Sequence, residues 1–105
     1  MSEILKRIKR CIIQGNVRFT FKAELEMLAD GLSRTDVLES ILTAQAIATE
    51  IRSPAIAAKR PAERLYVIQG FTFDNILVYT KGKLHRESRQ DTYYILVSSK
   101  RAVEG

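Results

Sequence analysis

The chain has 105 residues, a length that suits a single domain. Hydrophobic residues make up 46% and charged residues 28%, which excludes a disordered tail, a collagen-like fibre and a low-complexity linker. One cysteine excludes an intramolecular disulfide, and one histidine with one cysteine argues against a structural zinc site. No apolar run approaches the roughly 18 residues of a membrane span and no export signal is visible, so we expect a cytoplasmic protein without cofactor or membrane contact.

The net charge is +5, and the excess of positive charge lies entirely in the second half of the chain. Residues 1–50 carry seven basic and seven acidic side chains, whereas residues 51–105 carry ten basic and five acidic ones. A fold that brings the second half to one side would therefore present a basic face. Such a face favours polyanions, of which RNA and DNA are the usual ones.

Residues 2–14 have the pattern of an amphipathic helix. At 100° per residue, the apolar side chains fall within an arc of roughly 120°, and they are Ile4, Leu5, Ile8, Cys11 and Ile12. Ser2 suits the N-cap, and Gly15 can end the helix. We expect the apolar stripe to pack on the core and the basic side to face solvent. Contact of the basic side with RNA, a partner protein or a membrane surface is the alternative.

Two further helices are predicted before residue 50. The first covers residues 21–30, with Gly31 in the position of a C-terminal cap. The second begins after Ser33, which forms a partial capping box with Asp36, and should end within residues 45–48. We expect the apolar stripes of both helices to lie in the core.

The rest of the chain predicts an antiparallel sheet. Short extended segments are expected at 17–20 and 47–51, and residues 65–68 and 76–79 form a hairpin rich in β-branched and aromatic side chains. The apolar run at 92–98 predicts a central strand buried on both faces. Helices followed by an antiparallel sheet make a small α+β domain over residues 1–105.

Residues 80–91 are polar and basic, and Lys81-Gly82-Lys83 has the composition of a turn. The stretch holds four cations and the only histidine, and strands that contain tyrosines flank it. Cations bind phosphate and aromatic rings stack on bases, so the pattern favours single-stranded RNA. An ordinary solvated loop is the alternative interpretation.

Several segments together resemble a family of small bacterial proteins of unknown function that is grouped with the RelE/ParE-like toxins. The resemblance spans roughly Arg18 to Arg101, about four fifths of the chain, and is carried by residues 19–27, 30–33, 36–41, 65–68, 78–83 and 94–101. Helix 1–16 lies outside the resemblance, and residues 17–101 would form the RelE-like core. Many relatives have His and Arg in the motif around the second helix, where this chain has Lys22 and Glu26, which weakens any chemical role for that helix.

The resemblance, which includes the MqsR branch, implies a small twisted antiparallel sheet with helices packed on one side. It also implies a ribonuclease toxin of a type II toxin–antitoxin system, neutralised by an antitoxin that can carry a zinc-finger domain. The MqsR-type last strand has a basic residue near its end, and this implies a role for Lys100.

We therefore expect a toxin-like endoribonuclease that acts on mRNA without a metal ion. Fixed cations would stabilise the phosphorane, and proton carriers would serve the 2′-hydroxyl and the leaving 5′-oxygen. The candidate catalytic residues are Lys81, Lys83, Arg86 and Lys100 for charge, and His85, Tyr79 and Tyr94 for protons. The candidate RNA-binding residues are Arg60, Arg64, Arg89 and Arg101, with Gln69 as a base or antitoxin contact.

Two other functions stay open at this point. One is a non-catalytic module that binds RNA or the antitoxin, and the other is a gyrase inhibitor of the ParE type. An exposed general base inside a basic surface would separate the nuclease from the binding module. A homo-oligomer is compatible with each of the three.

Overall fold

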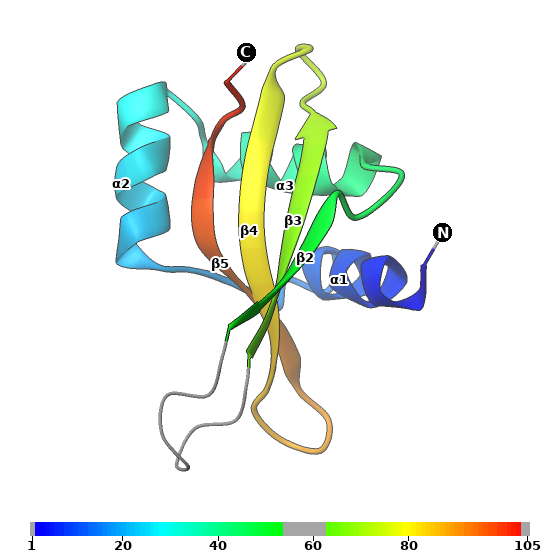
Figure 1. Ribbon diagram of the computed structural model, residues 1–105. Coiled ribbons are helices and arrows are strands. Elements are labelled where there is room, and N and C mark those ends of the chain that lie inside the picture. Colours follow the sequence, from blue (N-terminus) through cyan, green and yellow to red (C-terminus); the bar gives the residue numbers. More distant parts are fainter. Residues whose placement is uncertain (1, 54–62, 104–105) are drawn as a thin grey trace.

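The computed structural model describes residues 2–53 and 63–103. Figure 1 shows an α+β arrangement whose helices are α1 (Glu3–Ile13), α2 (Phe21–Asp30) and α3 (Arg34–Thr43). The strands are β1 (Val17–Phe19), β2 (Thr49–Ser53), β3 (Glu63–Phe71), β4 (Leu77–Arg86) and β5 (Thr92–Arg101). No helix in this described part of the chain is long and apolar enough to cross a membrane.

The strands form one five-stranded sheet in the order β1-β5-β4-β3-β2. The prediction of a purely antiparallel sheet is wrong, because β1 pairs with β5 in parallel, with Val17 opposite Tyr94. The other three pairings are antiparallel, and those of β3 with β4 and β4 with β5 are hairpins. Parallel strands need a long crossover connection, and all the residues between β1 and β5 supply one.

The last strand lies inside the sheet, as predicted, but the prediction that both of its faces are buried is wrong, because Tyr93 and Ile95 on one face are partly exposed. β5 pairs with β1 on one side and β4 on the other. Beyond the end of β1, α2 lies beside β5 (Figure 1). The carboxylate of Glu26 on α2 accepts hydrogen bonds from the Ser98 hydroxyl at 2.8 Å and the Ser99 backbone N–H at 3.2 Å. Glu26 therefore fastens α2 to β5.

The helix starts follow the predicted caps. The Ser2 hydroxyl accepts a hydrogen bond from the Leu5 N–H, and Ser33 and Asp36 complete a capping box. The third helix ends at Thr43, earlier than predicted. The Thr43 hydroxyl donates to the carbonyl oxygen of Phe71 at 2.7 Å, so contact with β3 ties down the last turn.

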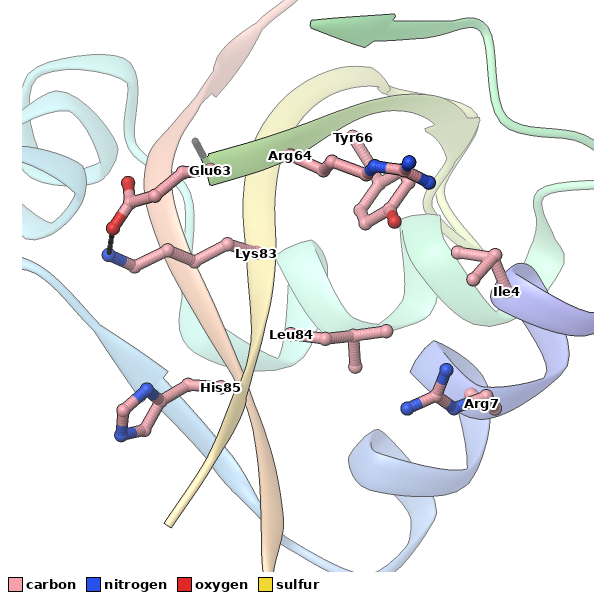
Figure 2. Close-up of a pocket in the computed structure, with 8 residues that line it drawn as sticks. All are labelled: Ile4, Arg7, Glu63, Arg64, Tyr66, Lys83, Leu84 and His85. Atoms are coloured by element: carbon pink, nitrogen blue, oxygen red, sulfur yellow. Dashed lines mark hydrogen bonds and ion pairs between the residues drawn. The ribbon is translucent and has the colours of Figure 1, made fainter. Parts of the chain in front are cut away.

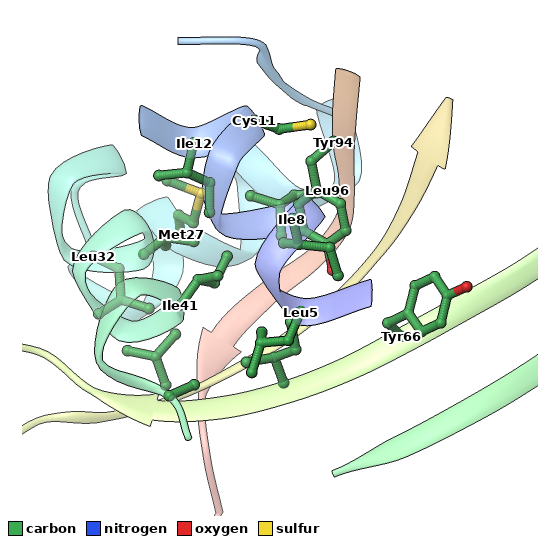
Figure 3. Packing of buried hydrophobic residues seen from close by; sticks show 14 residues of the cluster. Leu5, Ile8, Cys11, Ile12, Met27, Leu32, Ile41, Tyr66, Tyr94 and Leu96 are labelled. Atoms are coloured by element: carbon green, nitrogen blue, oxygen red, sulfur yellow. The ribbon is translucent and has the colours of Figure 1, made fainter. Parts of the chain in front are cut away.

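The core lies between one face of the sheet and helices α1 and α3 (Figures 1 and 3). The apolar stripe of α1 is buried as predicted, with Leu5 and Ile8 fully covered. They pack in one cluster with Ile41 of α3 and with Ile68 and Leu96 of the sheet. The helix outside the resemblance thus supplies part of the core.

The predicted loop at 80–91 is wrong over its first half. β4 continues through Lys81, Gly82 and Lys83 to Arg86, with a bulge in the β4–β5 pairing at this point. Gly82 is opposite Leu96, and Lys81 is opposite Ser98, so β5 has one extra residue there. The three residues with turn composition are therefore strand residues.

Candidate nucleic-acid interface

Four predicted site residues alternate along β4 and lie on one face of the sheet. They are Tyr79, Lys81, Lys83 and His85. The residues between them point toward the helices, and Val78 and Thr80 are fully buried. Side chains two apart in a strand share a face, so neighbouring members of the set lie about 7 Å apart. We call the side of the sheet that carries them the open face, since neither α1 nor α3 packs on it (Figure 1).

One end of this row combines a cation with an aromatic ring. Lys100 on β5 is directly opposite Tyr79, and its ammonium nitrogen lies 5.4 Å from the centre of the Tyr79 ring. Lys100 is exposed, and Tyr79 is partly exposed. Within the described residues, neither Lys100 nor the neighbouring Lys81 has a carboxylate partner. Both positive charges are therefore available to an incoming phosphate.

The other end of the row contains the only histidine. His85 is exposed and lies opposite Tyr93 on β5. The Arg18 guanidinium from β1 stacks over the Tyr93 ring at 4.2 Å and forms an ion pair with Glu87. The hydrogen bond to Glu87 raises the pKa of Arg18 above its usual value.

Sequence reasoning assigned no function to Arg18 and treated Tyr93 only as one of the aromatic residues that flank the basic stretch. Their place beside His85 depends on the parallel pairing of β1 with β5, which puts Arg18 opposite Ile95 and next to Tyr93. Periodicity within one strand could have placed Tyr93 on a face. It carries no information about which distant strand comes next to it.

Lys83 is less available than its neighbours on the open face. Its ammonium nitrogen lies 3.0 Å from a carboxylate oxygen of Glu63 at the start of β3. The pair is partly exposed, so the attraction is screened by water. An RNA phosphate would have to compete with Glu63 for Lys83, whereas Lys81 and Lys100 face no such competition among the described residues.

Arg86 does not join the open face. Its guanidinium donates to the backbone carbonyls of Ser88 at 3.3 Å and Arg89 at 3.1 Å, and so it closes the turn between β4 and β5. Arg89 lies exposed in that turn. The structure therefore gives Arg86 a role in loop geometry rather than the predicted role in charge stabilisation.

The remaining predicted cations are dispersed. Arg101 is held at the end of α2, because its backbone N–H and its Nε both donate to Asp30, at 2.8 and 3.1 Å. The Nε of Arg64 lies 3.6 Å from Glu50 on the neighbouring strand β2. Arg60 lies outside the described residues. The predicted basic face is thus smaller than expected from the sequence.

Tyr94 cannot carry protons for a substrate, and that prediction is wrong. Its side chain is fully buried against the core, with its ring over Gly82. Burial raises the pKa of its phenol far above the usual value. Its hydroxyl has no hydrogen-bond partner within the described residues. Of the three predicted proton carriers, His85 and Tyr79 are accessible.

A pocket of about 300 Å³ lies beside the lower end of β4, between this strand, β3 and α1 (Figure 2). The residues that line it are Ile4, Arg7, Glu63, Arg64, Tyr66, Lys83, Leu84 and His85. In Figure 2, Lys83 and His85 point to one side of β4, and Arg64, Tyr66 and Leu84 point to the other. The pocket therefore borders the open face but opens mainly on the side of α1.

Residues 2–53 and 63–103 contain no group of three histidine, cysteine, aspartate or glutamate side chains arranged to hold a metal ion. Cys11 is buried against the core, and burial raises the pKa of its thiol. Comparison with models of known protein families, with curated proteins and with solved structures finds no match to this chain. The geometry of the chain itself is therefore the basis for assigning a function.

Proposed function

We propose that the open face binds single-stranded RNA and that the chain is a toxin-like endoribonuclease with a RelE/MqsR-like fold. The observation that carries the proposal is the row of Tyr79, Lys81, Lys83 and His85 on the sheet face that neither α1 nor α3 covers, with Lys100 beside it. Lysines attract the phosphates without demanding a sequence, and the tyrosine rings offer surfaces on which bases stack. Action on mRNA would place the protein in the cytoplasm.

In the proposed reaction, the ribose 2′-oxygen attacks the adjacent phosphorus while the bond to the 5′-oxygen breaks. His85 accepts the proton of the 2′-hydroxyl and returns it to the leaving 5′-oxygen. Lys83, two residues away on the same face, stabilises the charge on the phosphorane after the phosphate displaces its partner Glu63, with Lys81 next in the row. The products are a 2′,3′-cyclic phosphate and a 5′-hydroxyl, and no metal ion takes part in the scheme.

A titration of RNA binding tests the open face directly. We expect Lys81→Ala and Lys100→Ala each to weaken binding of a fluorescent single-stranded RNA by about tenfold at low salt. Lys22→Ala removes an equal charge from α2 and serves as the control, with affinity within twofold of wild type. Equal losses in all three variants, or no loss in any, would refute an RNA site on the open face.

A second feature supports a protein partner such as the antitoxin. The expectation that the apolar side chains of α2 lie in the core is only partly right: Ala23 and Met27 are buried, but three others are exposed at helical spacing, Phe21 by 75%, Leu25 by 50% and Leu28 by 79%. A contiguous apolar stripe of this kind is typical of contact surfaces between proteins. The stripe lies on α2, away from the row on β4, so one partner could bind α2 and extend over the open face. This observation also favours the alternative of a non-catalytic module that binds an antitoxin.

A further inference from the structure

The pocket beside α1 has a chemical character of its own. Arg7 of α1 and Arg64 of β3 lie on its walls, together with Ile4, Tyr66 and Leu84 (Figure 2). These side chains lie on the opposite side of β4 from Lys83 and His85. The pocket is therefore distinct from the open face, although the strand segment 83–85 borders both.

Two guanidinium groups can serve an anion in this pocket. Arg7 has no carboxylate partner within the described residues. Arg64 faces Glu50 through its Nε at 3.6 Å, which leaves its other N–H groups to bind an oxyanion. Paired N–H donors of arginine match the spacing of phosphate oxygens. The charge of the pocket thus favours a phosphate group.

Glu63, Lys83 and His85 border the pocket on the side of the open face, and the lining on the side of α1 is otherwise apolar and aromatic. Tyr66 is 6% exposed, and Leu84 and Ile4 pack against the hydrophobic core next to it. Ile4 and Leu84 are partly exposed, so a bare phosphate ion would leave their apolar surface uncovered, whereas a flat ring attached to the phosphate would cover it. A volume of about 300 Å³ is at the lower end of the range for small-molecule sites.

We propose that this pocket binds a nucleoside monophosphate, with the phosphate at Arg7 and Arg64 and the base against Ile4 and Leu84. The same chemistry has two sources, a free mononucleotide and the phosphorylated end of an RNA strand. Binding of the free mononucleotide is independent of the proposed function. Binding of the RNA end rests on it, because a strand on the open face reaches the border of the pocket at His85.

Calorimetry with AMP, adenosine and inorganic phosphate tests the pocket. AMP should bind at least tenfold more tightly than adenosine or phosphate. Arg7→Ala and Arg64→Ala should each weaken AMP binding by about tenfold or more, since each removes charged hydrogen bonds to phosphate. Lys22→Ala on α2 should stay within twofold of wild type. Equal affinities for AMP and adenosine, or unchanged AMP binding in Arg7→Ala, would overturn the proposal.

A gain-of-binding variant guards against loss through misfolding. Glu50→Gln releases Arg64 from its ion pair and should tighten AMP binding several-fold, while an unchanged or lower affinity contradicts the role of Arg64. Arg7→Lys keeps the charge but loses the paired N–H donors, so its affinity for AMP should lie between those of wild type and Arg7→Ala. Circular dichroism should show the same helix content in all variants.

Short RNAs that differ only in a 5′-phosphate identify the source. A preference for the phosphorylated RNA that Arg7→Ala abolishes and Lys81→Ala retains assigns the pocket to the strand end. AMP binding without such a preference assigns it to the free nucleotide. If Lys81→Ala leaves RNA affinity unchanged while Arg7→Ala still weakens AMP binding, RNA binding by the open face is refuted and nucleotide binding by the pocket is supported. If AMP does not bind and a 5′-phosphate does not raise RNA affinity, the pocket proposal is wrong.

Discussion

The ring of Tyr94 lies directly over Gly82, so that a Cβ atom at position 82 would be 2.5 Å from its Cζ and 2.7 Å from its hydroxyl oxygen. Real Cβ atoms do not approach ring atoms so closely, and Tyr94 is fully buried with no room to move aside. Glycine is needed at position 82 for space rather than for a turn. The contact also fixes the ring in the core, away from any substrate.

Gly82→Ala should therefore destabilise the fold by about 1–3 kcal/mol, the usual cost of overpacking a core. Urea unfolding followed by circular dichroism measures the change. In a Tyr94→Leu background the same substitution should cost much less, because the smaller side chain leaves room for the methyl group. If Gly82→Ala is as stable as wild type, the Tyr94 ring does not occupy the position described.

Glu26→Ala should lower the free energy of unfolding by about 1–3 kcal/mol, because the buried Ser98 hydroxyl and the Ser99 N–H lose their acceptor. Glu24→Ala on the same helix is the control. Its ion pair with Arg34 is exposed, and such pairs contribute about 1 kcal/mol or less. Equal effects of the two substitutions in chemical denaturation would show that Glu26 is a surface charge without a structural role.

RNA binding should weaken steeply as salt concentration rises. Release of counterions from about four phosphates gives a log–log slope near −3 on single strands. Lys100→Ala should reduce the slope by about 0.7, the value for one phosphate. Arg101→Ala should change it little, because successive strand residues point to opposite faces and Arg101, the neighbour of Lys100, lies on the side of the sheet opposite the open face. A salt-independent affinity in fluorescence anisotropy would contradict electrostatic binding by the open face.

RNA cleavage should persist in EDTA and should produce 2′,3′-cyclic phosphate ends. His85→Ala should reduce the single-turnover rate at saturating protein by about 10²–10⁴-fold, the range for a lost general acid or base. Lys100→Ala should leave that rate within about twofold of wild type, because Lys100 lies at the Tyr79 end of the row, three spacings of about 7 Å from His85. Loss of affinity with an unchanged saturated rate in His85→Ala would show that His85 only binds RNA. Cleavage activity that disappears with EDTA would refute the metal-independent mechanism.

A protein partner should bind the apolar stripe of α2. Co-expression with the adjacent gene product and purification through a tag tests this, and zinc analysis of the complex tests for a zinc-finger antitoxin. Phe21→Ser and Leu28→Ser should abolish co-purification without loss of stability, because both side chains are exposed. Ile13→Ser, also exposed but on α1, is the control. A tight complex that forms equally well with all three variants would exclude α2 as the contact.

Local sequence signals determined the helices of this protein and most of its strand positions. A cap such as Ser33 with Asp36 acts over one turn, and apolar periodicity in α1 reports which side chains become buried, so both are readable without a fold. The apolar run of β5 likewise predicted its interior position. These signals are local because the interactions behind them are local.

Only the tertiary structure decided which cations and tyrosines meet. The pairing of β4 with β5 places Lys100 opposite Tyr79 and puts Lys81 and Lys83, predicted to form a turn, on one face of a strand. The pairing of β1 with β5 brings Arg18 into contact with Tyr93. Composition treated Tyr79 and Tyr94 alike, although one lines the open face and the other is buried over Gly82. The physical reason is that register, strand order and steric fit depend on residues far apart in the chain, whereas the charge of a segment says nothing about what it will lie against.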